Sequence, residues 1–332
     1  MRRLNIVILW FLLGMAGFCQ DPQFSQFYSN PLYLGPSFAG AVEGSRFAAA
    51  WRDQWIQATA VFRARSISYD HYFSTFNSGL GVLLFQDVSG TSGMGSTNIS
   101  LNYSYNFKVY NVWYIRPGLS FSYVEHGFYG DLLFGDEILH LMSGGSGNFS
   151  SAHPPARGKA RDIDAGSSLL VYTKKFWMGT TVDHMLTPSI ELYELEADIQ
   201  SIIPVKVSCY GGYEFRRRGK LLRPSDETMT FAFMYKQQRS SGQLDIGVYW
   251  HHSSPLVLGL WYRGIPIVNS QRGDAVVMLV GIDYRQWTIG YSYDLTISNL
   301  IGAVHGSHEI TASFKFLLPK RNKRGAVPCP AF

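Results

Sequence analysis

Apolar and polar residues alternate along much of the chain. Between Asn98 and Phe107, every odd-numbered residue is apolar or aromatic and every even-numbered residue is Ser or Asn. The segments 244–250, 288–294 and 310–316 alternate in the same way. Successive side chains of a β-strand point to opposite faces, so this pattern predicts strands that each have one apolar and one polar face.

Fourteen segments are candidates for such strands, near residues 46–54, 57–70, 78–88, 96–109, 112–125, 161–173, 176–186, 202–216, 227–237, 242–251, 255–263, 273–284, 286–297 and 307–317. No run of about 18 apolar residues follows residue 20, which excludes helices that cross a membrane. Charged residues make up 16% of the chain, below the roughly 25% of a typical soluble domain. These features leave a large soluble β-protein or a transmembrane β-barrel.

The connections between these strands separate the two classes. Three long connections are odd-numbered, namely the fifth (126–160), the seventh (187–201) and the thirteenth (298–306), and one, the eighth (217–226), is long but even-numbered. The short ones are even-numbered, namely the fourth (110–111), the sixth (174–175), the tenth (252–254) and the twelfth (285). Outer-membrane barrels have short periplasmic turns and longer external loops, whereas a sandwich has no reason to sort its loops. The pattern therefore predicts an all-β, antiparallel outer-membrane barrel of about 14 strands, with the odd-numbered connections outside the cell.

Tryptophans near strand ends fit the aromatic girdles of such a barrel, where an amphipathic ring lies at the level of the lipid headgroups. The residues that we assign to these girdles are Trp51, Trp55, Trp113, Trp177, Trp261 and Trp287.

Residues 1–19 have the features of an export signal. Two arginines precede the apolar stretch 4–13, and Cys19 is a small residue placed for cleavage before Gln20. Cys19 also permits the alternative of a lipoprotein, although the bulky Phe18 fits that alternative poorly. Removal of the signal leaves 27 basic residues against 24 acidic ones, a net charge of +3. The overall charge therefore gives no indication of binding to nucleic acid.

Residues 20–45 separate the signal from the first strand. Three prolines interrupt regular structure there, and the bulky residues show no period of two. We predict that this segment packs inside the barrel lumen or across its periplasmic mouth, because so many aromatic side chains would not stay in water. The alternative is a tether with scattered aromatics. The residues that we expect to make these contacts are Phe24, Phe27, Tyr28, Pro31, Tyr33 and Phe38.

Several charged residues fall at or near strand positions that face the predicted lumen. A charge on the lipid face of a barrel is costly, so we expect these side chains to line the lumen as ion pairs. They are Arg52, Asp53, Asp283, Asp294 and Glu309. No set of nucleophile, base and orienting group is identifiable, and no Cys/His cluster has the spacing of metal ligands. We therefore expect neither an enzyme nor a bound metal or cofactor.

Basic residues gather at the predicted periplasmic end of the barrel. The barrel is expected to span residues 46–317, and a basic tail, 318–332, to follow it into the periplasm. The basic side chains could hold lipid phosphates or contact an acidic periplasmic partner, or they could only fix the barrel in the membrane. They are Arg216, Arg217, Arg218, Lys220 and Arg223 before or within the eighth connection, and Lys320 and Arg321 in the tail.

Several stretches of the chain resemble the Bacteroidetes type IX secretion system membrane proteins of the PorP/SprF family. The stretches, in order, are "DPQFSQFYSNPLYLGPSFAG" at 21–40, "WRDQW" at 51–55, "DLLFGDEI" at 131–138, "GYSYDLTISNL" at 290–300, "SHEI" at 307–310 and "CPAF" at 329–332. The resemblance implies an outer-membrane barrel that takes part in protein export or in the surface display of adhesins, including those of gliding motility. It also implies two kinds of protein partner, a secreted cargo outside and the periplasmic part of the apparatus inside.

Two functions follow from these features. The first is a non-enzymatic outer-membrane component of type IX secretion that supports export or surface attachment of cargo proteins. The second is an outer-membrane channel or transporter for small solutes, since a barrel of about fourteen strands can enclose a lumen. The two differ in whether the lumen is open, and the aromatic segment 20–45 favours a filled lumen. The sequence does not name the cargo.

Overall fold

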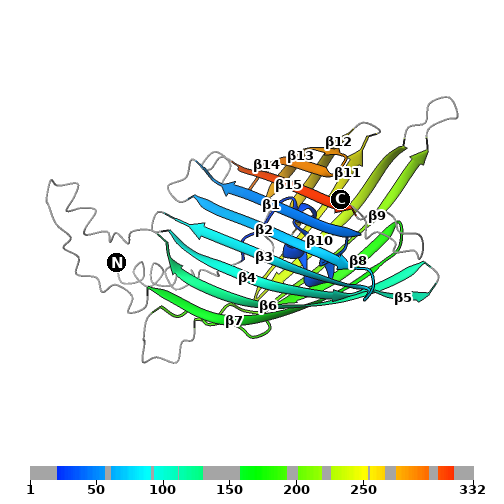
Figure 1. Ribbon diagram of the computed structural model, residues 1–332. Coiled ribbons are helices and arrows are strands. Elements are labelled where there is room, and N and C mark those ends of the chain that lie inside the picture. Colours follow the sequence, from blue (N-terminus) through cyan, green and yellow to red (C-terminus); the bar gives the residue numbers. More distant parts are fainter. Residues whose placement is uncertain are drawn as a thin grey trace, which may run out of the picture.

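The computed structural model describes residues 21–56, 61–90, 93–110, 112–129, 158–192, 201–218, 226–252, 255–265, 274–298 and 306–317. Nearly all of these residues are in strands, which form one curved wall (Figure 1). The strands are β1 (Gly44–Gln54), β2 (Phe62–Phe73), β3 (Ser78–Ser89), β4 (Met94–Tyr105), β5 (Phe107–Tyr110), β6 (Trp113–Phe128), β7 (Lys159–Tyr172), β8 (Phe176–Asp183), β9 (Lys206–Arg218), β10 (Asp226–Gln238), β11 (Ser241–His251), β12 (Leu256–Ile265), β13 (Ala275–Tyr284), β14 (Trp287–Thr296) and β15 (Ser307–Leu317).

The wall is a closed antiparallel barrel. Strands that follow one another in the chain pair side by side, and the last strand, β15, pairs with β1 to close the ring. β4 and the short β5 both pair with β6, so these two are parts of one wall strand that is interrupted at Asn106. The 15 strands among the described residues therefore form a barrel wall of 14 strands, since β4 and β5 count as one, and this confirms the predicted barrel. The predicted fourth strand, 96–109, corresponds to these two parts.

Several predicted strand starts differ from the structure, most of them by one or two residues, and β2 begins at Phe62, whereas the sequence suggested residue 57. The barrel begins at Gly44 and not at residue 46. β9 begins at Lys206, whereas the sequence suggested residue 202. Pro204 lies between these positions and has no N–H group for a ladder hydrogen bond, which accounts for the later start. The predicted signal, 1–19, and the predicted tail, 318–332, lie outside the described residues.

The outer face of the barrel is apolar and the inner face is polar over much of the wall. In β4, Ile99 is 47% exposed and Leu101 is 54% exposed, whereas Ser100 between them is 5% exposed. A soluble barrel would bury the apolar side chains and expose the polar ones. The inverted arrangement fits a wall that faces lipid.

Three short helices lie inside the ring of strands (Figure 1). They are η1 (Phe27–Ser29), α2 (Pro31–Leu34) and η2 (Pro36–Phe38). In the described part of the chain, no helix is long and apolar enough to cross a membrane.

The predicted girdle is wrong for two of its six tryptophans. Trp51, Trp113 and Trp287 are exposed on the outer face. Trp177 and Trp261 instead point inward and are almost completely buried, at 0% and 3% exposure. Each of the two pairs across the ladder with a glycine, Gly212 for Trp177 and Gly247 for Trp261. A Cβ atom at Gly247 would lie 2.2 Å from the Trp261 ring, so the missing side chain makes room for an indole on the inner face.

Candidate functional site

The inner segment, which we define as residues 21–43, runs through the barrel from end to end. We call the end at which β1, β6, β8 and β14 finish the loop end, and the opposite end the turn end. At the loop end, the carboxylate of Asp21 lies 2.7 Å from Nζ of Lys206, the first residue of β9. At the turn end, the backbone N–H of Gly40 donates to Asp70, near the end of β2, at 2.8 Å. The chain thus enters β1 only after it has passed along the inside of the wall.

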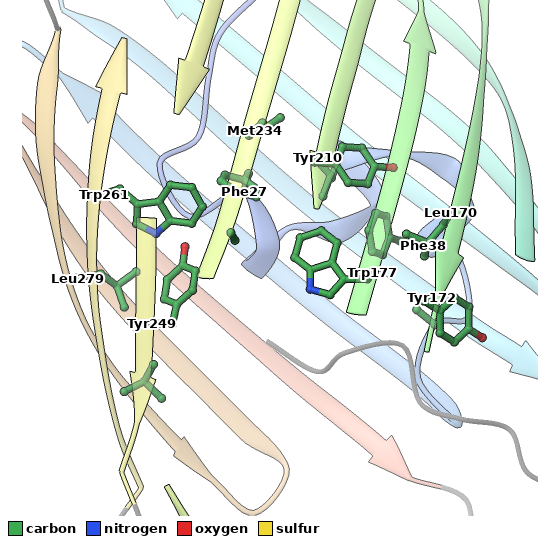
Figure 2. Close-up of a cluster of buried hydrophobic side chains, with 14 of the residues drawn as sticks. Phe27, Phe38, Leu170, Tyr172, Trp177, Tyr210, Met234, Tyr249, Trp261 and Leu279 are labelled. Carbon is green, nitrogen blue, oxygen red and sulfur yellow. The ribbon is translucent and has the colours of Figure 1, made fainter. Parts of the chain in front are cut away.

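An apolar cluster joins the middle of the inner segment to strands on one side of the wall (Figure 2). The ring centroids of Phe27 and Trp261 are 5.0 Å apart, and those of Phe38 and Tyr210 are 5.6 Å apart. The buried Trp177 belongs to the same cluster. Full burial of a large apolar side chain contributes roughly 1.5–3 kcal/mol, so these contacts hold the segment firmly.

A second apolar cluster joins the segment to β3. Phe24 packs edge-on against Tyr33 at a centroid distance of 5.0 Å and against Phe85 at 6.0 Å. Leu32 and Leu83 complete this contact. Of the six residues expected to make contacts inside the barrel, four are buried and two are partly buried. The buried ones are Phe24, Phe27, Pro31 and Phe38, and the partly buried ones are Tyr28 and Tyr33.

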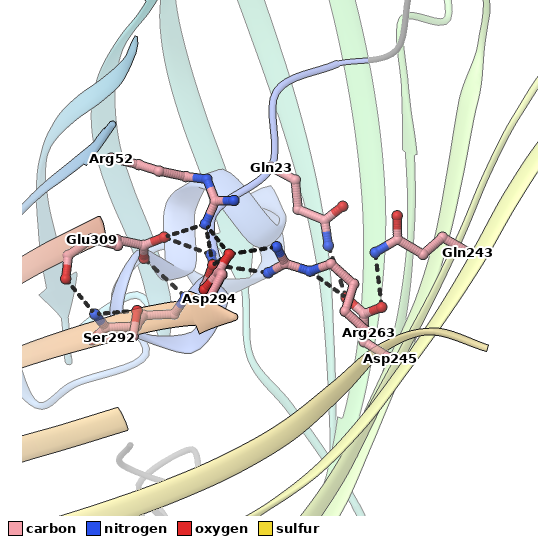
Figure 3. Close-up of polar contacts among 10 residues, drawn as sticks. Gln23, Arg52, Gln243, Asp245, Arg263, Ser292, Asp294 and Glu309 are labelled. Atoms are coloured by element: carbon pink, nitrogen blue, oxygen red, sulfur yellow. Dashed lines mark hydrogen bonds and ion pairs between the residues drawn. The ribbon is translucent and has the colours of Figure 1, made fainter. Parts of the chain in front are cut away.

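An ion network surrounds the start of the inner segment near the loop end (Figure 3). It consists of Arg52, Asp245, Arg263, Asp294 and Glu309, all of which are buried. Asp294 lies 2.7 Å from both Arg52 and Arg263, and Arg52 lies 3.4 Å from Glu309. The charges come from five different strands of the wall, and each is compensated by a neighbour of opposite sign.

The backbone of the inner segment completes this network. The N–H groups of Ser25 and Gln26 donate to the two carboxylate oxygens of Glu309 at 2.6 Å and 2.9 Å. The hydroxyl of Ser25 donates to Asp294 at 2.7 Å and accepts from both arginines of the network. Buried backbone donors need such partners, so the network binds the segment, and the segment in turn supplies hydrogen bonds to Glu309 and Asp294.

At the turn end, a second set of polar contacts holds the inner segment. Arg46 and Asp70 form a buried ion pair at 2.9 Å, and the same arginine donates to the carbonyl oxygen of Phe38 at 3.2 Å. Gly118 of β6 faces this part of the segment. A Cβ atom at Gly118 would lie 2.2 Å from the backbone nitrogen of Ser37, so only glycine permits this close approach.

Two of the five predicted lumen charges lie apart from the network. Asp53 follows Arg52 directly and therefore points to the opposite face, where it accepts a hydrogen bond from Nε1 of the exposed Trp51 at 3.0 Å. Its prediction as a lumen charge was wrong. Asp283 has the inward register of β13 but is exposed near the turn end, where it accepts from Thr288 at 3.0 Å.

The predicted basic rim is described only in part. Arg216 is exposed and pairs with Glu214 at 2.8 Å. Arg217 and Arg218 are the last two residues of β9. Lys220, Arg223, Lys320 and Arg321 lie outside the described residues.

A cluster of four charged side chains ties Asp21 to the wall at the loop end. His184, just after β8, contacts Asp21 through Nε2 at 2.9 Å and Asp164 through Nδ1 at 2.7 Å. Burial alone would lower the pKa of His184, but the two carboxylates outweigh it and raise the pKa to about 9. Burial would raise the pKa of Asp21, yet Lys206 and His184 hold it well below its usual value. His184 is therefore a cation at neutral pH and bridges the segment to β7.

We expect this bridge to weaken at alkaline pH. The pKa of His184 is raised from its ordinary value of 6.5, so its contribution is complete below that pH and is lost as the pH rises through about 9. The loss should be on the order of 2 kcal/mol in the free energy of unfolding. Urea unfolding of the detergent-solubilised protein between pH 6.5 and 10 measures it. The variant His184→Gln should lack this part of the pH dependence, and an equal loss in both proteins would contradict the assignment.

The sequence analysis missed several residues that hold the inner segment. Asp245 occupies a polar position of the alternating segment 244–250, which is a usable signal of an inward charge. Arg263 is the single charged residue of β12, a position that could also have been suspected. Asp21, His184 and Lys206 stand in or beside connections, where their sequence context gives no such signal. Among the described residues, no group of three or more His, Cys, Asp or Glu side chains is placed to hold a metal ion.

A closed antiparallel barrel with an apolar outer face defines the class of outer-membrane β-barrel proteins. The model of the family described as type IX secretion system membrane protein PorP/SprF matches residues 16–314, and the chain belongs to this family. The protein is accordingly an outer-membrane component of type IX secretion. Both its family and its fold are of non-enzymatic kinds. A comparison with curated proteins found no match.

Solved structures with the same architecture are outer-membrane proteins of low sequence identity. The CymD monoaromatic hydrocarbon channel is 13% identical, with 92% of this chain and 97% of that chain covered and a TM-score of 0.50. The outer membrane protein Omp33 of Acinetobacter baumannii is 8% identical, with 83% and 100% covered and a TM-score of 0.47. The P. putida toluene transporter TodX is 11% identical, with 84% and 90% covered and a TM-score of 0.43. At these identities, the likeness extends to the fold alone.

Proposed function

We propose that this protein supports the export of cargo proteins, such as adhesins, or their attachment at the cell surface. We further propose that the inner segment fills the lumen, so that the barrel does not conduct small solutes. Membership of the type IX secretion family supports a role with exported proteins. The observation that carries the closed state is the course of the inner segment, which contacts the wall at the loop end, in the middle and at the turn end.

The energetics of the contacts support a closed state that persists. Withdrawal of the segment would remove the donors of Ser25 and Gln26 from the buried carboxylate of Glu309 and expose two apolar clusters. An unsatisfied buried polar group costs about 1–3 kcal/mol, and each large apolar side chain adds a similar amount. The segment is therefore a part of the folded barrel and not a lid in easy exchange.

Orientation gives each end of the barrel a role in this proposal. We place the loop end outside, because the long connections belong there in outer-membrane barrels. The cargo would then meet the loop end, and the periplasmic secretion apparatus would meet the turn end and the exposed Arg216. The lipid of the outer membrane covers the apolar outer face.

Deletion of the gene in its own bacterium tests the proposal. We expect at least one secreted protein to disappear from the cell surface and to accumulate in the medium or the periplasm, while uptake of small solutes stays unchanged. Quantitative mass spectrometry of surface-biotinylated proteins measures the first, and growth on single nutrients measures the second. An unchanged surface with slower entry of one nutrient would favour the alternative function, a channel for small solutes.

A further inference from the structure

A cavity of about 310 Å³ lies between the inner segment and the wall, and it is partly open. Leu32 and Tyr33 of the inner segment border it on one side. Strands β3, β4 and β6 border it on the other, with Phe85 and a row of polar side chains. Its size is at the lower limit of pockets that hold a small ligand or one side chain of a partner.

One carboxylate in this cavity has no cationic partner in the part of the chain that the structure describes. Asp87 has the inward register of β3 and lines both this cavity and a second one of about 430 Å³ at the loop end. The other acidic residues of the cavity wall are paired. Asp21 and Asp183 lie 2.7 Å and 3.2 Å from Lys206, and Asp164 pairs with His184. Asp87 therefore has no cation beside it, although it borders space that a ligand can enter.

Two polar atoms of the same wall lack hydrogen-bond partners. They are Oδ1 of Asn98 and Nε2 of His126, and both atoms are buried. The His126 side chain is itself buried, and its other nitrogen, Nδ1, contacts the hydroxyl of Ser96 at 2.9 Å. We assign the proton to Nδ1, which then donates to the Ser96 hydroxyl, so that Nε2 is an acceptor, as is Oδ1 of an amide. Buried acceptors without a partner are costly, so their presence beside a cavity indicates a missing donor.

The register of the barrel places these groups together. Asp87 of β3 is the ladder partner of Ser96 of β4, which is in turn the partner of His126 of β6. Asn98 is the next inward residue along β4. Three acceptors thus surround Ser96 on three neighbouring strands, which lie about 4.8 Å apart in a sheet.

We infer that this cavity binds the side-chain ammonium group of a lysine on a docked polypeptide. A primary ammonium carries three N–H donors, and the wall offers three acceptors, namely Oδ1 of Asn98 and Nε2 of His126, which lack partners, and the carboxylate of Asp87, which lacks a cation. Its positive charge compensates Asp87, and its four-carbon stem fits against Leu32, Tyr33 and Phe85. An arginine fits less well, because its planar fork of five donors would leave several unsatisfied. The inference rests on the proposed function and deepens it, since it specifies a chemical feature of the cargo.

Calorimetric titration of the purified full-length barrel in detergent tests the inference. The probe is Nα-acetyl-lysine methylamide, and its matched neutral control is Nα,Nε-diacetyl-lysine methylamide. We expect the lysine probe to bind and the neutral control to bind at least about tenfold more weakly, because a charge-assisted hydrogen bond to Asp87 is lost. The variant Asp87→Asn should bind the lysine probe more weakly by a similar factor. The variant Asp53→Asn, on the outer face, should leave binding unchanged.

Three results would overturn the inference. They are no binding of the lysine probe, equal binding of the two probes, and unchanged binding of the lysine probe to Asp87→Asn. For the third result, the heat-dependent shift on gels must show that the variant is folded. Butylamine distinguishes the sources of the ammonium group. Tighter binding of butylamine than of the lysine probe would assign the site to a free small amine and not to a polypeptide. None of these results depends on surface display, so the inference can fail while the proposed function stands.

Discussion

Replacement of Glu309 by alanine should release the start of the inner segment. This carboxylate accepts two backbone N–H groups of the segment and lies beside Arg52, all out of contact with water. The variant Glu309→Ala leaves both N–H groups without an acceptor, while Asp294 still compensates the charge of Arg52. We expect the free energy of unfolding to fall by about 3 kcal/mol or more. Urea unfolding in detergent, followed by tryptophan fluorescence, measures this change.

Two variants control for this prediction. Glu309→Gln keeps an acceptor oxygen and should lose less stability than the alanine variant. Asp53→Ala removes a carboxylate on the outer face of the neighbouring strand β1, next to the ladder partner of Glu309, and should cost less than about 1 kcal/mol. Similar losses in Glu309→Ala and Asp53→Ala would show that the network does not hold the segment.

Deletion of residues 21–40 should turn the closed barrel into an open pore. These residues supply the aromatic side chains of the inner segment and the backbone donors to Glu309. Without them, water would fill the lumen, as it does in porins. We expect steady, ohmic conductance of the deletion variant in a planar lipid bilayer, at least about tenfold above that of the full chain. A folded deletion variant that stays closed would mean that other residues block the lumen.

The inward face of a strand was predictable where that face is polar. It was less predictable where the strand packs against the inner segment. In β4, Ser100 and Asn102 face inward and Ile99 and Leu101 face outward, so the sequence alternates without exception. In β13, Val277 and Leu279 also face inward, because they pack in the apolar cluster with the inner segment. Both faces of β13 are then apolar, and the pattern carries no sign of which face is which. Loss of alternation in this barrel therefore marks the wall that the inner segment contacts.

The same effect explains the misplaced tryptophans. Trp51 and Trp261 both stand near strand ends, and a girdle position was the natural prediction for each. Only the register separates them, since Trp51 points to lipid and Trp261 points to Phe27 of the inner segment. The apolar surroundings of Trp261 on both faces of β12 gave no basis for the choice.

The ion network depends on closure of the barrel, which no local pattern encodes. Arg52 and Glu309 lie far apart in the sequence but are direct ladder partners, because β1 pairs with β15. The sequence could identify both as inward charges but could not give their register. Asp53 was misassigned because a strand boundary good to only a few residues cannot fix which of two adjacent residues points inward.

The conductance of the intact, full-length protein tests the central claim most directly. That claim is that the chain closes its own barrel and serves exported proteins instead of passing small solutes. We expect single molecules of the unmodified protein, reconstituted in a planar bilayer at neutral pH, to show no steady open level. A large and stable conductance of the intact chain, equal to that of the 21–40 deletion, would contradict the claim and favour a solute channel.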